Sequence, residues 1–314
     1  MAFHDTLRND TAALYTDLYQ LTMLQAYHRE AMHETAVFDL FVRRLRNRNV
    51  LLACGLEPIL EYLENVSFSE EALHYLADQH LFTDDFLQWL EDFSFTGDVY
   101  AVAEGTPVFP DIPLIEVVAP IGEAQLVETF LLNQMTFQTG IASKALRVVR
   151  AAKADGTDRL VADFGMRRMH GTDAAMKGAR AMYIAGVDST SNVAAGEAYD
   201  IPITGTMAHS YIEAHPDEET AFRAFSDLYP ETILLVDTYD TIDGVRAVVD
   251  LAHERGEDFQ ISGIRLDSGD LAELAHEARH VLDQAGLRDV KIVASSGLDE
   301  QAIADLLSAD APID

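Results

Sequence analysis

The sequence of 314 residues predicts an α/β fold, with an N-terminal α+β domain over residues 1–120 and an irregular, TIM-like (β/α) barrel over residues 121–314. Two observations predict this division. The first part mixes helical and strand patterns without strict alternation. From residue 159 onward, short apolar β runs alternate with amphipathic helical stretches, which indicates parallel strands joined by helical crossovers.

The N-terminal part contains helical and extended patterns of different periods. Apolar residues with helical spacing predict helices over residues 16–31 and 69–92, and residues 121–153 are also predicted to be helical. The run AVFDLFV, residues 36–42, predicts a strand, and residues 97–120 predict strands interrupted by turns. This order of elements is typical of an α+β domain.

Six apolar runs predict the strands of the second domain. They are RLVADF (159–164), YIAGVD (183–188), IPITGT (201–206), TILLVD (232–237), ISGIRLD (261–267) and VKIVAS (290–295). A doubly wound open sheet is the alternative to a barrel. A complete barrel needs eight strands and about 250 residues. We therefore expect the chain to be truncated or incomplete at Asp314.

The composition excludes several classes of function. The net charge is −31, with 53 Asp and Glu against 22 Lys and Arg, so the surface would repel nucleic acids and anionic lipids. The acidic residues are spread along the chain, which is typical of proteins adapted to concentrated salt. Cys54 is the single cysteine and predicts a buried core residue. Neither a membrane-spanning run nor a secretion signal is evident, which predicts a cytoplasmic location.

The active site of an α/β barrel lies at the carboxyl ends of its strands, so the strand list predicts a site list. Polar or aromatic residues follow every predicted strand. In chain order they are Phe164, Arg167 and Arg168; Ser191; Thr206 and His209; Asp237 and Thr238; Arg265, Asp267 and Ser268; and Ser295 and Ser296.

These residue types suit the binding of an anionic substrate. Arginine captures carboxylate or phosphate through two donors, and small hydroxyl residues surround phosphates. Aspartate can hold a sugar diol or Mg²⁺, and a histidine can move a proton or form a phosphoenzyme. Each residue also has a structural interpretation: strand-end aspartates commonly cap helices, and DSGD (267–270) is a good N-cap sequence.

Six segments resemble the nicotinate phosphoribosyltransferases, in the same order along nearly the whole chain. They are TDLYQLTM (16–23), SKALRVVR (143–150), FGMRRMHGTDAAMKGARA (164–181), GVDSTSNVAAG (186–196), GTMAHS (205–210) and IRLDSGD (264–270). The resemblance implies the barrel fold of the type II phosphoribosyltransferases. It also implies the coupling of nicotinate to phosphoribosyl pyrophosphate, driven by ATP with Mg²⁺, and the release of nicotinate mononucleotide and pyrophosphate.

The same resemblance implies a role for each matching residue. Phe164 and Tyr19 would sandwich the pyridine ring, with Tyr19 contributed by the second subunit of a homodimer that shares its active sites. Arg265 would bind the nicotinate carboxylate near Thr206, and His209 would be phosphorylated by ATP. Phosphate and ribose groups would be bound by Arg167 and Asp267, with Arg168, Ser268 and Ser296 as further substrate-binding residues. The family continues into a glycine-rich phosphate loop, which would follow Asp314.

Three alternatives remain at the level of the sequence. Nicotinamide phosphoribosyltransferases place an aspartate where this chain has Ser191, and a neutral serine favours nicotinate because a carboxylate would repel it. A non-catalytic, degenerate barrel would not bind phosphoribosyl pyrophosphate. A Schiff-base aldolase would need a lysine at a strand end, and none of the four lysines lies there.

Overall fold

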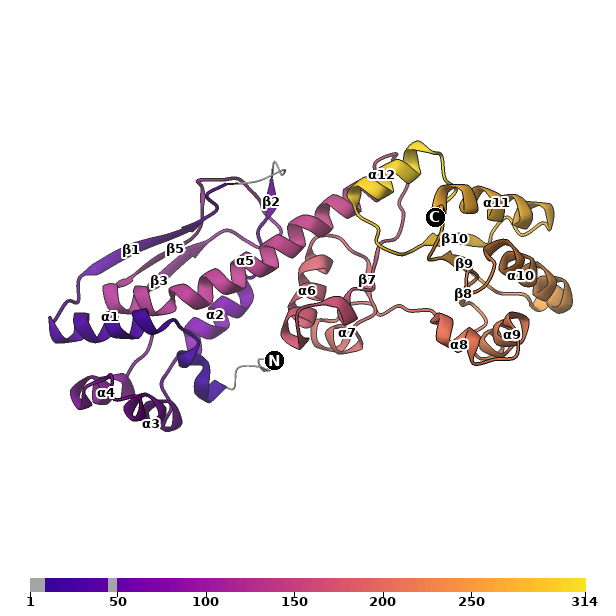
Figure 1. Ribbon diagram of the computed structural model, residues 1–314. Coiled ribbons are helices and arrows are strands. Elements are labelled where there is room, and N and C mark those ends of the chain that lie inside the picture. Colours follow the sequence, from indigo (N-terminus) through magenta and orange to yellow (C-terminus); the bar gives the residue numbers. More distant parts are fainter. Residues whose placement is uncertain (1–8, 45–49) are drawn as a thin grey trace. The chain divides into compact units, whose positions relative to one another are not determined.

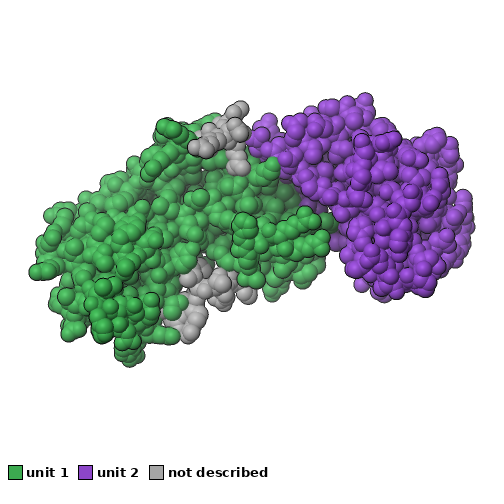
Figure 2. All heavy atoms as spheres, in the orientation of Figure 1, with its two compact units in different colours: residues 1–146, 163–203 green, residues 147–162, 204–314 purple. Residues whose placement is uncertain are grey.

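The computed structural model describes residues 9–44 and 50–314 (Figure 1). Contacts divide the chain into two compact units. Unit 1 contains Met1–Leu146 and Asp163–Ile203, and unit 2 contains Arg147–Ala162 and Thr204–Asp314 (Figure 2). The boundary predicted at residue 120 falls within unit 1, directly before helix α5 (Ile121–Ala152).

An antiparallel sheet forms the first part of unit 1. Strand β5 (Pro113–Pro120) lies in the centre, between β1 (Thr35–Phe41) and β3 (Asp98–Ala101). A second, two-stranded sheet pairs β2 (Leu51–Leu52) with β4 (Pro107–Val108). The strands predicted over 36–42 and 97–120 are therefore confirmed.

Helix α5 (Ile121–Ala152) covers one face of the three-stranded sheet (Figure 1). Its Leu126 and Phe130 are buried in one core with Ile115 and Val117 of β5. Phe130 also stacks on Tyr62 with ring centroids 3.9 Å apart, and such a pair stabilises a core by about 1 kcal/mol beyond its buried area. The helix predicted over 121–153 is confirmed.

Smaller helices complete the core of unit 1. They are η1 (Asn9–Leu14), α1 (Leu18–Arg29), α2 (Leu56–Asn65), α3 (Glu70–Asp78) and α4 (Asp84–Glu91). The helix predicted over 16–31 is α1. The pattern over 69–92 contains two helices rather than one, because Thr83 caps a new helix by accepting from the backbone N–H of Phe86.

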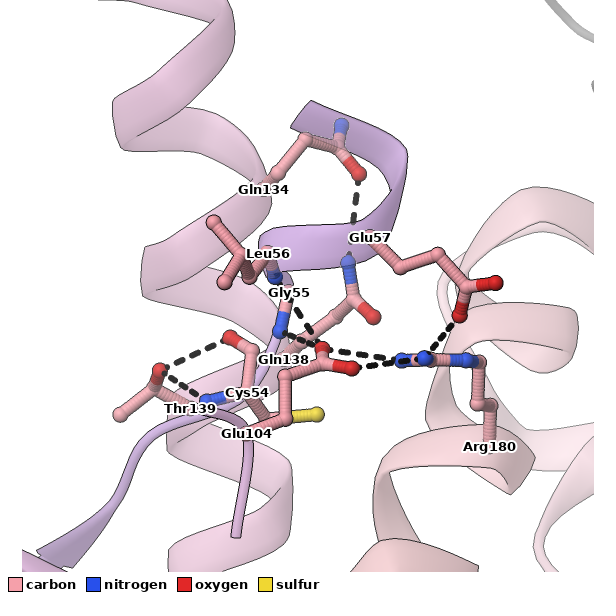
Figure 3. A network of polar contacts seen from close by, with 9 residues as sticks. All are labelled: Cys54, Gly55, Leu56, Glu57, Glu104, Gln134, Gln138, Thr139 and Arg180. Atoms are coloured by element: carbon pink, nitrogen blue, oxygen red, sulfur yellow. Dashed lines mark hydrogen bonds and ion pairs between the residues drawn. The ribbon is translucent and has the colours of Figure 1, made fainter. Parts of the chain in front are cut away.

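A partly buried ion pair connects three segments of unit 1 (Figure 3). The Glu104 carboxylate accepts from the backbone N–H groups of Gly55 (2.6 Å) and Leu56 (3.1 Å), at the N-terminus of α2. It also pairs with Arg180 at 2.7 Å, and Arg180 contacts Glu57 as well. Gly55 has φ 111°, and a Cβ there would lie 2.7 Å from the carbonyl oxygen of Gln134, so only glycine fits.

The second part of unit 1 corrects one strand prediction. YIAGVD (183–188) is wrong as a strand, because Tyr183 and Ile184 complete helix α6 (Thr172–Ile184). Gly186, at φ 95°, then ends the helix, with Val187 N–H donating to the Met182 carbonyl in a Schellman arrangement. The strand begins afterwards, as β7 (Ser189–Thr190), which pairs with β6 (Ala162–Asp163).

Two further segments follow in unit 1. Helix α7 (Val193–Tyr199) begins at Asn192, whose side chain caps it. The run IPITGT (201–206), predicted as a strand, contributes a single bridge between Ile203 and Thr190. That prediction is therefore wrong for most of its length.

Unit 2 contains a parallel sheet, as predicted. Strand β9 (Gly263–Leu266) lies between β8 (Ile233–Leu235) and β10 (Lys291–Ala294). Its other elements are α8 (His209–Glu213), α9 (Glu218–Leu228), α10 (Thr241–Arg255), η3 (Gly256–Asp258), α11 (Leu271–Gln284) and α12 (Glu300–Ser308). Leu234, Ile264 and Ile292 are fully buried in the core that the sheet shares with α10 and α11.

The fold is therefore mixed α/β, with the predicted strand–helix alternation clearest in unit 2. In residues 9–44 and 50–314, the paired strands form four separate sheets of two or three strands. A closed barrel is not among these pairings, so the barrel stays a prediction.

The ion pair of Glu104 gives a first prediction. Burial alone would raise the pKa of Glu104, but the bonds from Arg180 and Gly55 outweigh burial and hold that pKa below its ordinary value. We expect Glu104→Ala to lower the free energy of unfolding by about 2–3 kcal/mol, because it removes two helix-capping bonds and leaves Arg180 without its buried partner. Denaturant unfolding followed by the fluorescence of Trp89, the single tryptophan, measures this loss in unit 1.

Glu57→Ala is the matched control. It removes the other carboxylate that contacts Arg180. Because the Glu57 side chain is 70% exposed, we expect the free energy of unfolding to fall by less than about 1 kcal/mol. Equal losses in the two variants would contradict the interpretation.

Candidate functional site

Three polar residues form a row at the carboxyl edge of the parallel sheet. The register pairs Leu235 with Arg265 and Leu266 with Ala294. Asp237, Asp267 and Ser295 therefore follow the three strands at equivalent positions. The Ser295 hydroxyl donates to Asp267 Oδ1 at 2.5 Å, which joins two members of the row directly.

Asp237 fixes the turn that follows β9. Its Oδ2 accepts from the backbone N–H of Asp267 at 2.9 Å and from the Ser268 hydroxyl at 2.6 Å. The side chain is 93% buried, at 7% relative exposure. Asp270 then caps α11 by accepting from the N–H groups of Ala272 and Glu273. One carboxylate thus positions the turn, and another begins the helix.

His209 lies beside this turn, at the first position of α8. Its Nδ1 is 3.2 Å from the Thr238 hydroxyl, and its Nε2 is 3.8 Å from Asp267 Oδ2. Both side chains of the His209–Asp267 pair are more than a third exposed. A histidine held in this way has one ring nitrogen oriented by a hydroxyl and the other beside a carboxylate.

Arg265 is the buried cation of unit 2. It is 9% exposed and lies on β9, two residues before Asp267, so both side chains leave the same face of the sheet. Its Nη1 donates to the Thr206 hydroxyl, and its Nη2 donates to the Met207 carbonyl at 3.1 Å. These bonds fix the plane of the guanidinium group.

Ser296 follows Ser295 in an exposed turn. Its φ of 81° lies in the left-handed region, which is costly for a residue with a Cβ, and Gly297 follows at φ 63°. The turn leads to Asp299, which caps α12. Ser296 therefore lies next to the row without being part of its bonds.

A second group of the predicted residues lies in unit 1. Asp163, which is 7% exposed, accepts from the Thr190 hydroxyl (2.8 Å) and from the N–H of Gly165 (2.7 Å). Its carbonyl accepts from the N–H of Ser191 at 2.8 Å. Asp163 therefore connects two segments, one that begins with Phe164 and one that contains Ser191.

Other aromatic and basic side chains of the predicted site are exposed in unit 1. Phe164 is 38% exposed, and Arg167 and Arg168 are exposed in the short helix η2 (Met166–Arg168). Tyr19 of α1 is 50% exposed, and its hydroxyl accepts from Gln20 at 3.2 Å. Exposure leaves these aromatic faces accessible for stacking.

The structure thus sorts the sequence predictions into two groups. In unit 2 it brings together Thr206, His209, Arg265, Asp267 and Ser268. Asn192, Asp240 and Asp270, which also follow predicted strands, are helix caps.

Two carboxylates of unit 2 have contacts that the sequence did not predict: Asp237 was named only as a residue that follows a strand, and Glu218 was not named. Asp237 follows a predicted strand, but its position gives no indication of which hydrogen bonds it accepts. Glu218 begins α9 and has no sequence signal, since acidic residues are common in the first turn of helices.

Other features concern membranes and metals. In the part of the chain that the structure describes, no helix has the length and apolarity required to cross a bilayer. Within the same residues, no group of three or more His, Cys, Asp or Glu side chains is arranged to hold a metal ion.

The fold and these side chains define a mixed α/β protein with a buried arginine, a histidine and an aspartate at one sheet edge. Two family descriptions match the chain: the nicotinate phosphoribosyltransferase N-terminal domain over residues 14–136, and the nicotinate phosphoribosyltransferase family over residues 160–310. The chain belongs to the nicotinate phosphoribosyltransferase family.

Relatives and solved structures agree with this assignment. A nicotinate phosphoribosyltransferase of Mycobacterium tuberculosis is 53% identical over 98% of this chain and 66% of its own length. The Bacillus subtilis enzyme is 46% identical, over 98% of this chain and 62% of its own length. The chain thus spans slightly less than two thirds of these relatives.

Two solved structures have similar folds. Human nicotinic acid phosphoribosyltransferase has a TM-score of 0.85 at 28% identity, over 95% of this chain and 71% of the human chain. A nicotinate-nucleotide pyrophosphorylase from Pyrococcus furiosus has a TM-score of 0.78 at 26% identity, over 99% of this chain and 72% of that chain.

The capping role of Asp270 gives the second prediction. We expect Asp270→Ala to lower the free energy of unfolding by about 1 kcal/mol, because two backbone N–H groups of α11 lose their acceptor. Asp270→Asn keeps an equally good cap and should change stability little. Thermal unfolding followed by circular dichroism compares the two variants, and an equal loss in both would show that the charge of Asp270, rather than its cap, matters.

Proposed function

We propose that the protein is a nicotinate phosphoribosyltransferase of NAD salvage, which forms nicotinate mononucleotide and pyrophosphate from nicotinate and phosphoribosyl pyrophosphate. The observation that carries this proposal is the buried Arg265, whose guanidinium plane is fixed by Thr206 and Met207 on the same strand face as Asp267. The relatives of Mycobacterium tuberculosis and Bacillus subtilis, named for this activity, support it.

Arg265 is suited to the carboxylate of nicotinate. A planar guanidinium binds a carboxylate through two parallel bonds, and burial strengthens such bonds because little water competes. Nicotinamide has no carboxylate, and Ser191 lacks the negative charge that would favour an amide over an acid. Nicotinate is therefore the expected base.

Asp267 and Ser268 are suited to the ribose phosphate. The Asp267 carboxylate can accept from a pair of ribose hydroxyls, and its position is held by Ser295 and Asp237. Reaction at the sugar carbon needs position and charge neutralisation rather than a protein nucleophile. Arg167, Arg168 and Ser296 are the further phosphate-binding candidates, each at an exposed position.

His209 is the proposed site of coupling to ATP. If the Nδ1–H donates to Thr238, Nε2 keeps its lone pair and is the nucleophile. Attack on the γ-phosphorus forms the N–P bond and breaks the bond to the β-phosphate oxygen, so ADP leaves. Hydrolysis of the phosphohistidine then returns the free histidine and phosphate.

Mg²⁺ is proposed to accompany the phosphates of the substrates. Mg²⁺ commonly binds through one or two carboxylates together with substrate phosphates, and Asp267 offers one accessible carboxylate. When bound, the ion would neutralise charge on the pyrophosphate.

Other features of the proposal follow from the family resemblance. Phe164 and Tyr19 are proposed to stack on the pyridine ring, with Tyr19 contributed by the second subunit of a homodimer. The sheet of unit 2 is proposed to be part of a (β/α) barrel. The charge of −31 favours a protein that works in concentrated salt, in the cytoplasm.

Product formation tests the activity. We expect nicotinate mononucleotide, separated by chromatography, from nicotinate but not from nicotinamide, in the presence of KCl, Mg²⁺, ATP and phosphoribosyl pyrophosphate. Arg265→Lys should raise the KM for nicotinate by about tenfold or more, because a bidentate contact is lost. Arg246→Lys, at an exposed pair on α10, is the control.

Each other outcome decides against part of the proposal. Product from nicotinamide alone would identify a nicotinamide phosphoribosyltransferase. If a folded protein formed no product from either base and did not bind phosphoribosyl pyrophosphate, a non-catalytic barrel would be the better description.

The phosphohistidine is tested separately. We expect His209→Ala to abolish the stimulation by ATP and the acid-labile labelling of the protein by γ-labelled ATP, because the ring nitrogen is gone. His215→Ala is the matched control, since His215 lies six residues further on and its Nδ1 is bound to the Tyr211 carbonyl. Labelling that persists in His209→Ala would place the phosphate elsewhere.

A further inference from the structure

Glu218 and Asp237 present two buried carboxylate oxygens that have no hydrogen-bond partner in the described residues. They are Oε1 of Glu218 and Oδ1 of Asp237. A buried oxygen of this kind usually has a donor, because an unsatisfied buried acceptor costs free energy and an unsatisfied anion costs more. The pair lies at the carboxyl end of β8, where α9 and α10 begin nearby in the fold.

The two carboxylates differ in the hydrogen bonds that they accept. The other oxygen of Asp237, Oδ2, accepts from the Asp267 N–H and the Ser268 hydroxyl, so Asp237 has two donors. No equivalent bond to Glu218 is recorded among the described residues. Of the two, Asp237 is therefore the better place for a negative charge.

The surroundings of Glu218 favour its protonated form. Burial is the main cause that raises its pKa, to about 7, and the charges of Asp237, Asp240 and Asp243 raise it further. The charges that raise this pKa all come from carboxylates.

The nearby cations of the packed helices have other partners. Arg246 of α10 pairs with Asp243, and Arg223 of α9 pairs with Glu254. His215, which follows α8, is bonded through Nδ1 to a backbone carbonyl. A proton is accordingly the simplest way to reduce the charge of the pair.

We propose that Glu218 is a positioning residue of the site: it keeps one proton, so that Asp237 is the charged member of the pair and holds the Asp267–Ser268 turn in place. Ionisation of Glu218 would put a second negative charge beside Asp237. The repulsion would then displace the carboxylate on which the turn depends.

The first experiment measures the proton without using activity. Because the pKa of Glu218 is raised in the folded state, its contribution to stability is greatest at low pH and is lost as pH rises toward about 7. Glu218→Gln keeps the shape but cannot ionise. We therefore expect the Tm of Glu218→Gln, relative to the unaltered protein at the same KCl concentration, to rise between pH 5 and 8.

Glu219→Gln is the matched control. Glu219 is exposed in the same first turn of α9, so its replacement removes the same charge from the same helix end. Its Tm should follow that of the unaltered protein across the pH range. A constant difference between Glu218→Gln and the unaltered protein would overturn the proposal.

The second experiment measures positioning, and it alone rests on the proposed function. We expect the KM of the unaltered protein for phosphoribosyl pyrophosphate to rise by about threefold or more above pH 7, and this rise to be absent in Glu218→Gln. Glu218→Ala, which also cannot ionise, should likewise lack this rise. If the Tm result holds while the KM profiles coincide, Glu218 keeps a proton without positioning the turn, and the positioning role is overturned. If the unaltered protein has no activity, the proposed function fails. The Tm result would still show whether Glu218 keeps its proton in the folded protein.

Discussion

The hydrogen bonds of Asp237 are the constraint on which the site in unit 2 depends. Parallel pairing of β8, β9 and β10 brings the carboxyl ends of three strands to one edge, but pairing alone does not fix the loops beyond that edge. Asp237 fixes them by binding the first backbone N–H after β9 and the hydroxyl that follows. Asp267 is thereby placed beside Ser295 and within 3.8 Å of His209.

Arg180 and Arg265 show how a chain with few cations uses them. Arg180 lies between Glu104 and Glu57 and joins α6 to the N-terminus of α2, so its charge serves the fold of unit 1. Arg265 donates to a hydroxyl and a backbone carbonyl, which set the orientation of its guanidinium plane. Carboxylate partners indicate a structural role, whereas an oriented arginine at a strand end is typical of an anion-binding site.

Sequence patterns predicted the strands of unit 2 that form continuous apolar runs. The runs TILLVD, ISGIRLD and VKIVAS became β8, β9 and β10, because a parallel strand buried on both faces is a continuous apolar run. YIAGVD has the same composition, yet its first residues complete a helix. What distinguishes YIAGVD from a strand in the structure is the Schellman turn at Gly186. The hydrogen bonds of that turn join residues three and five positions apart, and a run of apolar residues does not predict them.

The same reasoning applies to the site. Arg265, Asp267 and His209 were predicted because they follow strands and match family motifs. Glu218 was not, since its pKa is raised by burial and by the carboxylates that follow β8 and begin α10, which lie about 20 residues further along the chain. Neither burial nor distant charge is visible in the residues around position 218.

The difference between surface and buried charge explains why a proton matters at Glu218. Concentrated salt screens the many carboxylates of the surface, since the Debye length falls to about 3 Å at 1 M. Salt does not reach buried carboxylate oxygens in the same way, so repulsion between Glu218 and Asp237 would persist when the charges of the surface are screened. In an acid-rich protein, a protonated carboxyl therefore removes negative charge where dissolved ions cannot.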